Sequence, residues 1–351
     1  MQTQWQTFLI EQGGKLDAQQ RIRFDQTQAS LASLSDTPII TGLDHYGLIQ
    51  VSGDDARSFL QAQFSNDINL IDSDHVQFSA YCNPKGRMLA QFLVIPHDND
   101  YLLVLPREIL DKTLSRLRMF VLRSAVTLTD ISDSYACFGI LSANGSALPD
   151  NLLVLPPDPY SQSTIEQAHV IQLPAPVKRY LIVATLEKAQ VLWQQLAPHC
   201  QIADASSWDW ADIQAGLPSV WTPTVEEFVP QMMNLELIGG VSFKKGCYPG
   251  QEIVARMHYL GKPKRRMFRL HTEDRNIPAP GTDIYLAEGE TQSIGKVVLA
   301  QASQDGGVDL LAVLLITHIN NGNWRLGSPQ GPVLALQTLP YEVDISEQTA
   351  S

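Results

Sequence analysis

The chain has 351 residues and a mass of 38.9 kDa, enough for two or three domains of ordinary size. Its hydrophobic content of 44% and charged content of 18% are typical of globular proteins and exclude a largely disordered chain. A formal net charge of −12 argues against a generally basic, nucleic-acid-coating surface. The longest apolar run, residues 310–316, is too short to cross a membrane, and residues 1–14 do not resemble a signal peptide. We therefore expect a cytoplasmic protein.

The four cysteines are far apart in the sequence, at Cys82, Cys137, Cys200 and Cys247. They form no CxxC pattern and no cluster with histidine, so a metal or cluster site built from local ligands is not expected. Scattered cysteines without a signal sequence fit a reducing compartment. Taken singly, each has the alternative of being a small, buried apolar side chain.

The first third of the chain predicts alternating strands and helices. In chain order we expect a helix and a polar linker within 1–38, a strand over 39–51 broken at Gly42 and Gly47, a helix from Asp54, a hairpin over 78–95, a strand over 101–105 and a helix over 108–122. The hairpin is predicted by two apolar runs that flank a turn sequence, Asn-Pro-Lys-Gly. The helices are predicted from apolar residues that recur at helical spacing.

The same mixed pattern continues to about residue 220 and then changes. A strand is expected over 177–184, a helix over 186–196, and a helix from Trp208 that Gly216 and Pro218 terminate. From residue 267 onward the pattern consists of short strands separated by glycines, at 267–271, 282–286, 294–300, 309–316 and 333–337. Strands at this spacing predict a small antiparallel barrel. The fold class expected is therefore α+β with a C-terminal β-barrel.

The segment 244–266 has the most unusual composition of the chain. Against a single acid, Glu252, it carries seven basic residues, which are Lys244, Lys245, Arg256, Lys262, Lys264, Arg265 and Arg266. Cys247 lies among them, and nearby positive charge or a helix opening after Gly250 would favour its thiolate. A reactive thiol is one interpretation. The alternatives are a solvated linker with Cys247 packed in a turn, and a patch that contacts RNA or another anion.

A family resemblance follows from the motif around Cys247. Residues 245–252 read Lys-Gly-Cys-Tyr-Pro-Gly-Gln-Glu, which resembles the signature of the YgfZ family. Weaker matches to the family lie at 53–56, 84–88, 213–218, 228–231, 234–235, 239–245 and 254–256, so the resemblance covers roughly residues 38–342. It implies a folate-binding protein that is linked to iron–sulfur enzymes and tRNA modification. It also implies a fold related to the glycine-cleavage T-protein, an aminomethyltransferase.

The resemblance implies three domains around a central opening, the first two of them discontinuous. The boundaries we expect are 1–50 with 134–220 for the first domain, 51–133 with 221–265 for the second, and 266–345 for the barrel. Tetrahydrofolate, or another folate, would bind in the central region. The family's aromatic positions there map to Tyr46 and Trp208, although the family typically has Trp where this chain has Tyr46. Gln214, in place of the transferase glutamate, would hydrogen-bond the ligand.

Two departures from the aminomethyltransferase concern its chemistry. Where that enzyme has a pair of aspartates, this chain resembles it but has Ala90 and Gln91. Neither side chain is a general base, so the resemblance implies a folate site without aminomethyl transfer. A folate-dependent one-carbon transferase is the alternative.

The function we expect is that of a folate-binding accessory protein in iron–sulfur cluster assembly or repair, and thereby in tRNA modification. Cys247 would be the functional thiol toward iron–sulfur client or assembly proteins, and Lys245 would lower its pKa. The remaining motif residues would shape the loop or bind the partner; they are Gly246, Tyr248, Gly250, Gln251, Glu252 and Arg256. Direct tRNA contact through residues 244–266 is the further alternative.

Overall fold

The computed structural model describes residues 3–24, 37–142, 148, 152–261, 263–287, 292–320 and 322–345. These residues fall into two compact units, both discontinuous in sequence. Unit 1 is Met1–Phe59, Asn69–Gln77 and Leu93–Ala211, and unit 2 is Leu60–Ile68, Phe78–Phe92 and Asp212–Ser351. The α+β class is confirmed. The three-domain division stays a prediction, and residues 27–36 of the expected linker lie outside the described residues.

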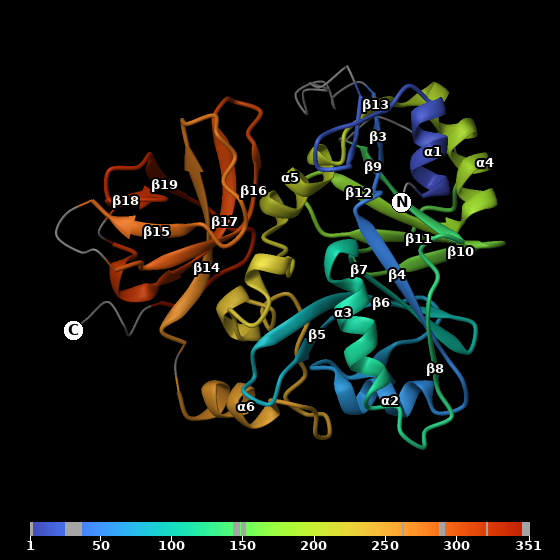
Figure 1. Ribbon diagram of the computed structural model, residues 1–351, viewed down its shortest axis with the longest axis horizontal. Helices are drawn as coiled ribbons and strands as arrows, with labels where there is room; N and C mark the ends of the chain where they lie inside the picture. Colours follow the sequence, from blue (N-terminus) through green and yellow to red (C-terminus); the bar gives the residue numbers. More distant parts are fainter. Residues whose placement is uncertain are drawn as a thin grey trace. The chain divides into compact units, whose positions relative to one another are not determined.

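Unit 1 contains a six-stranded sheet with the order β10-β11-β12-β9-β3-β13. Its pairs are antiparallel except β13 with β3, which is parallel. The strands are β3 (Ile39–Gly42), β9 (Tyr135–Ser142), β10 (Gln162–Ile165), β11 (Ala168–Leu173), β12 (Lys178–Thr185) and β13 (Gln201–Ala203). Figure 1 shows α1 (Gln4–Glu11) and α4 (Leu186–Leu196) side by side along this sheet.

An aromatic cluster joins these two helices to the sheet. The ring of Trp193 on α4 is edge-on to the rings of Trp5 on α1 and Phe138 on β9. The ring centroids are 5.7 Å and 5.8 Å apart, respectively. Edge-to-face pairs of this kind add to the free energy gained from burying their surface. Helix α1 begins at Gln4 because the side chain of Thr3 accepts a hydrogen bond from the Gln6 backbone amide, and the Gln6 side-chain oxygen accepts one from the Thr3 backbone amide.

A second, five-stranded sheet has the order β5-β6-β7-β4-β8. Its strands are β4 (Tyr46–Ser52), β5 (Gln77–Cys82), β6 (Met88–His97), β7 (Asp100–Pro106) and β8 (Thr127–Asp130). The predicted 78–95 hairpin is thereby confirmed. The expected break at Gly47 is wrong, because Gly47 lies inside β4, where a Cβ would come 2.4 Å from Leu110 Cδ1.

The predicted barrel is confirmed within unit 2. It is closed in the order β14-β17-β16-β15-β18-β19, with β19 pairing back onto β14. Its strands are β14 (Arg265–Thr272), β15 (Asp283–Leu286), β16 (Gly295–Ala302), β17 (Val308–Leu315), β18 (Trp324–Leu326) and β19 (Val333–Gln337). The three-residue β18 was not predicted from the sequence, because a strand this short carries little periodicity.

The remaining described elements are short. They are a two-stranded ribbon of β1 (Lys15–Leu16) and β2 (Ile22–Arg23), the helices α2 (Ala56–Gln63), α3 (Arg107–Arg118), α5 (Ser206–Ala215) and α6 (Gln251–Tyr259), and the 3₁₀ turns η2 (Ile68–Leu70), η3 (Ala197–His199), η4 (Thr222–Thr224), η5 (Pro230–Met233) and η6 (Ile316–His318). Helix α3 ends at Arg118, before the expected residue 122, and Leu122 itself has a positive φ of 48°, which is not helical. In the described part of the chain, no helix has both the length and the apolar character that a membrane span requires.

Candidate functional site

The loop before α6 exposes the side chain of Cys247. The other three thiols of the chain are less accessible: Cys82 and Cys137 are buried, and Cys200 is partly buried. Burial raises the pKa of each of these three thiols to about 12. Because the thiolate is the reactive form, these raised pKa values make the three thiols poor nucleophiles at neutral pH. Cys247, which is exposed, is the cysteine that a partner or an oxidant can reach.

Lys245 is a buried anchor of this loop, with its residue 8% exposed. Its Nζ donates hydrogen bonds to the carbonyl oxygens of Gln61 at 2.6 Å and Phe64 at 2.5 Å, at the C-terminal end of α2. An ammonium group there offsets the negative end of the helix dipole. Burial lowers the pKa of Lys245 to about 8, and the charge of Asp67 acts in the opposite direction. The effect of Lys245 on the thiol stays a prediction.

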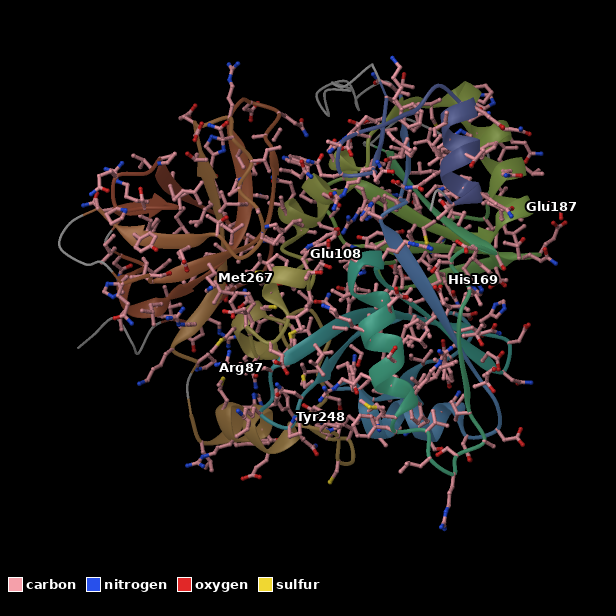
Figure 2. The ribbon with its side chains drawn as sticks, in the orientation of Figure 1. Arg87, Glu108, His169, Glu187, Tyr248 and Met267 are labelled. Carbon is pink, nitrogen blue, oxygen red and sulfur yellow. The ribbon has the colours of Figure 1, made fainter. Side chains whose placement is uncertain are left out.

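Tyr248 is the second anchor. The residue is buried, and its ring centroid lies 5.1 Å from the Lys245 ammonium nitrogen, within the range of a cation–π contact. Burial raises the pKa of its phenol, so the hydroxyl stays protonated. Gln251, the first residue of α6, donates from Nε2 to the Lys245 carbonyl at 3.4 Å. Figure 2 labels Tyr248 beside the α6 segment.

Gly250 fixes the far end of the loop by backbone contact. It has a φ of +82° and precedes α6 as its N-cap. A Cβ at this position would come 2.5 Å from the Asn83 carbonyl oxygen and 2.6 Å from the Cα of Gly86. Position 250 therefore requires glycine for two reasons: its positive φ, and the close approach of its backbone to the β5–β6 turn.

The eight motif residues thus divide into two groups. Lys245 and Gly250 contact other segments of unit 2, and Tyr248 and Gln251 contact Lys245 within the loop. Gly246, Cys247, Glu252 and Arg256 are exposed. The predicted helix after Gly250 is confirmed as α6. The loop thus presents a thiol to solvent, and the helix that follows it carries one exposed carboxylate, Glu252, and one exposed guanidinium, Arg256.

An aromatic group on the outer side of the same segment was not predicted. The rings of Phe243 and His258 are stacked, with centroids 3.7 Å apart and planes 8° apart. Tyr259 contacts both rings edge-on and is 63% exposed, and the next residue, Leu260, is 83% exposed. The spacing of His258 and Tyr259 in the sequence gave no signal for this group, because Phe243 reaches it from the other side of the loop.

The predicted folate contacts have different surroundings. Trp208 is 1% exposed, and a Cβ on Gly139 would come 2.4 Å from its ring; the Arg179 guanidinium carbon lies 4.7 Å from the ring centroid. Within unit 1 it is therefore a core residue, and its contact with folate stays a prediction. Tyr46 is partly buried, with its ring 4.3 Å from the His45 ring.

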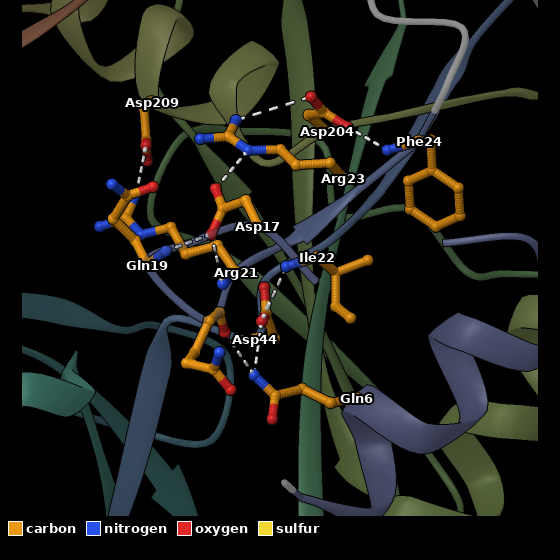
Figure 3. Close-up of polar contacts among 11 residues, drawn as sticks. Gln6, Asp17, Gln19, Arg21, Ile22, Arg23, Phe24, Asp44, Asp204 and Asp209 are labelled. Atoms are coloured by element: carbon orange, nitrogen blue, oxygen red, sulfur yellow. Dashed lines mark hydrogen bonds and ion pairs between the residues drawn. The ribbon is translucent and has the colours of Figure 1, made fainter. Parts of the chain in front are cut away.

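Charged groups of the N-terminal ribbon lie close to the first part of α5, the helix that carries Trp208 (Figure 3). Arg21 lies 3.8 Å from Asp209 on that helix, and Arg23 lies 3.5 Å from Asp204, just before it. Asp204 also accepts a hydrogen bond from the Phe24 amide at 2.6 Å. The N-terminal ribbon thus contacts the start of α5 within unit 1, which supports a structural role for these charged residues.

In unit 2 the amide groups of Gln214 and Gln91 differ in their partners. The Nε2 of Gln214 donates to Asp309 at 3.0 Å, and its Oε1 accepts from Arg269 at 2.5 Å, so both ends are engaged. Gln91 on β6 is 5% exposed, and its Oε1 has no hydrogen-bond partner among the described residues. A buried unpaired carbonyl oxygen is costly and suits an N–H donor such as those on a pterin. Gln91 therefore keeps an acceptor without a partner among the described residues, whereas both ends of the Gln214 amide are engaged.

Comparisons with known proteins agree with this architecture. A family model described as the GCVT N-terminal domain matches residues 6–153. The tRNA-modifying protein YgfZ of Pectobacterium carotovorum is 30% identical over 322 residues, which cover 90% of this chain and 96% of that protein. The same protein of Yersinia pseudotuberculosis is 30% identical over 305 residues, or 87% and 92% of the two chains.

A solved structure gives the fold. The glycine cleavage system aminomethyltransferase T from Bartonella henselae matches with a TM-score of 0.72 and 14% identity, covering 95% of this chain and 96% of that one. The aminomethyltransferase-like fold expected from the sequence is thereby confirmed.

Proposed function

Because the chain belongs to the family of the tRNA-modifying protein YgfZ, we propose that it is a folate-binding accessory protein for iron–sulfur enzymes, including enzymes that modify tRNA. Cys247 is its functional thiol in this proposal. The partners are iron–sulfur client or assembly proteins, and the cytoplasm is its compartment.

The presentation of Cys247 is the observation that carries the proposal. A cysteine that served only to fill space would be buried, as Cys82 and Cys137 are. Cys247 is instead exposed between two buried anchors, Lys245 and Tyr248. The backbone on either side is fixed by hydrogen bonds and by the Gly250 contact, so the thiol meets a partner in one defined geometry.

The position of Gln91 supports folate binding without transfer chemistry. The aminomethyltransferase carboxylates are replaced by Ala90 and Gln91, and both residues are buried on β6. An alanine methyl and a neutral amide cannot take up a proton at neutral pH, whereas the Gln91 carbonyl oxygen can accept a hydrogen bond from bound folate. Folate itself would supply one-carbon chemistry only where a protein base assists it.

The thiol proposal is tested by complementation of a deletion strain. Cys247→Ala should leave an iron–sulfur-dependent tRNA nucleoside modification at the level of the deletion strain, with the protein still folded and expressed. Cys200→Ala is the matched control, because Cys200 is partly buried and lies in unit 1, and it should restore the modification. Full rescue by Cys247→Ala would overturn the role of the thiol.

The folate proposal is tested by titrating the full chain with tetrahydrofolate and an amine donor. Saturable binding without release of a one-carbon unit, weakened by Gln91→Leu, is the result expected. Turnover would favour the one-carbon transferase instead. Absence of binding would overturn the folate proposal and would mean that this chain shares the fold of the aminomethyltransferase without a folate site.

The exposed aromatic group favours a second candidate, direct contact with tRNA. Stacked and exposed rings beside cations are the elements of single-stranded nucleic-acid sites, and Tyr259 lies near the exposed side chains of Arg256 and Lys264 in the sequence. The net charge of −12 opposes this candidate. Salt-dependent tRNA binding that Arg256→Glu and Tyr259→Ala abolish would support it, and binding unaffected by either substitution would exclude it.

A further inference from the structure

Unit 1 contains a cavity of about 750 Å³ that the proposed function does not use. It lies at the turn between β4 and α2, the loop after η2, the β6–β7 turn and the strands β10 and β11. Its lining residues include Asp54, Arg57, Asp98, Gln162 and His169. The volume lies in the range of cavities that hold small organic molecules. None of its lining residues belongs to the Cys247 loop.

A directed chain of hydrogen bonds forms one wall of the cavity. Gln162 donates from Nε2 to the Ser73 carbonyl at 2.7 Å, so its Oε1 is the atom 3.1 Å from His169 Nδ1. An amide oxygen only accepts, so His169 carries its proton on Nδ1. Burial lowers the pKa of His169 to about 4, and the ring is therefore neutral at pH 7, with Nε2 as an acceptor.

This tautomer fixes the next ring in the chain. His97 Nδ1 lies 2.9 Å from His169 Nε2 and must be the donor of that bond. In the neutral form of this ring, the proton on Nδ1 leaves Nε2 as an acceptor. The contact of that atom is the Tyr135 hydroxyl at 3.4 Å, which is long for a hydrogen bond. The wall therefore ends in an acceptor that a better-placed donor would satisfy. His169, which belongs to the cavity lining, is labelled in Figure 2.

The charges around the cavity also favour donors. Asp54 and Asp98 are exposed and make no hydrogen bond or ion pair with another described residue. Glu166 is paired with Lys188 at 2.5 Å, and Asp100 accepts from Gln50 at 2.8 Å. Arg57 is the one lysine or arginine in the lining. A ligand that complements this lining carries positive charge and several N–H groups.

The geometry does not suit a metal ion. Among the described residues, no group of three or more histidine, cysteine, aspartate or glutamate side chains is arranged to hold one. A linear organic cation can instead space its charges along the cavity, one near each carboxylate. We propose that this cavity binds an aliphatic polyamine, with its ammonium groups at Asp54 and Asp98 and one N–H directed to His97 Nε2.

The test is calorimetric titration of the full chain with spermidine at physiological ionic strength. Saturable one-to-one binding is expected, and the double variant Asp54→Asn, Asp98→Asn should weaken it by at least about tenfold, or about 1.4 kcal/mol. Asparagine tolerates the positive φ of 53° at residue 98, so the turn is kept. Asp111→Asn, an exposed site on α3 outside the cavity, is the matched control and should bind as the wild type does.

A third variant tests the histidine wall. His97→Phe keeps a ring but removes the acceptor and should also weaken binding; if this variant does not fold, the aspartate pair decides the question alone. Absence of saturable binding would overturn the proposal. Equal weakening by Asp111→Asn, or displacement of spermidine by an equal charge concentration of Mg²⁺, would also overturn it, since each indicates diffuse attraction to an acidic protein.

Discussion

Gly250→Ala is the substitution that most directly tests how the Cys247 loop is held. An alanine at the φ of +82° costs about 1–2 kcal/mol, because its Cβ crowds the following carbonyl. The same Cβ would come 2.5 Å from the Asn83 carbonyl oxygen and 2.7 Å from the Gly86 nitrogen. Both are backbone atoms, so the turn must move, and overpacking of this kind costs about 1–3 kcal/mol more. The expected total is about 2–5 kcal/mol.

Gly246→Ala is the matched control in the same loop. Nothing lies within 4 Å of a Cβ there, and Gly246 does not have a positive φ, so the expected change is within about 0.5 kcal/mol. The free energy of unfolding from urea titration and the alkylation rate of Cys247 are the two measurements. Gly250→Ala should lower the first and alter the second, because the loop separates from the β5–β6 turn. Equal values for the two alanine variants would refute the reasoning.

Three further expectations concern the thiols and the pH. In native protein one thiol, Cys247, should react rapidly with a maleimide, with a second fast-reacting site contradicting its assignment as the accessible cysteine. Burial lowers the pKa of His45 to about 3 and of His169 to about 4, so below pH 6.5 the folded state binds fewer protons than the unfolded state does. The free energy of unfolding should therefore fall by roughly 1.4 kcal/mol per group for each pH unit, down to those pKa values. The test is urea unfolding between pH 7 and 4, where a flat profile would contradict it. The pKa of Lys245 is lowered from 10.5 to about 8, so its contribution to stability should rise between these pH values; a wild-type minus Lys245→Met difference that does not grow would contradict this.

The barrel and the hairpin show what local pattern can predict. Glycine-punctuated apolar runs gave five of the barrel strands, within a few residues of β14, β15, β16, β17 and β19. Such runs suffice because strand alternation and turn residues are local properties of the chain. The pattern was misleading at Gly47, where glycine makes room for Leu110 rather than breaking a strand.

The sequence also singled out Cys247, through local charge and a motif, but it could not assign roles to the motif residues. Lys245 was expected to act on the thiol. Its ammonium also binds carbonyl oxygens 184 and 181 positions earlier, at the end of α2, which no local pattern indicated, and its effect on the thiol stays a prediction. The packing of Trp208 against Gly139 was not predicted either, and its contact with folate stays a prediction. Contacts between residues this far apart leave no periodic signal in a single sequence.

By itself, then, the sequence determined the α+β class and the terminal barrel, and it singled out the segment around Cys247, because these depend on local periodicity and composition. The tertiary structure alone decided that Cys247 is exposed while Lys245 and Tyr248 are buried, and that Gln91 keeps an unpaired oxygen. It also brought His97 and His169 together from 72 positions apart. The physical reason is that burial and hydrogen-bond partnership depend on which segments meet in the folded chain, and neighbours in sequence do not fix that.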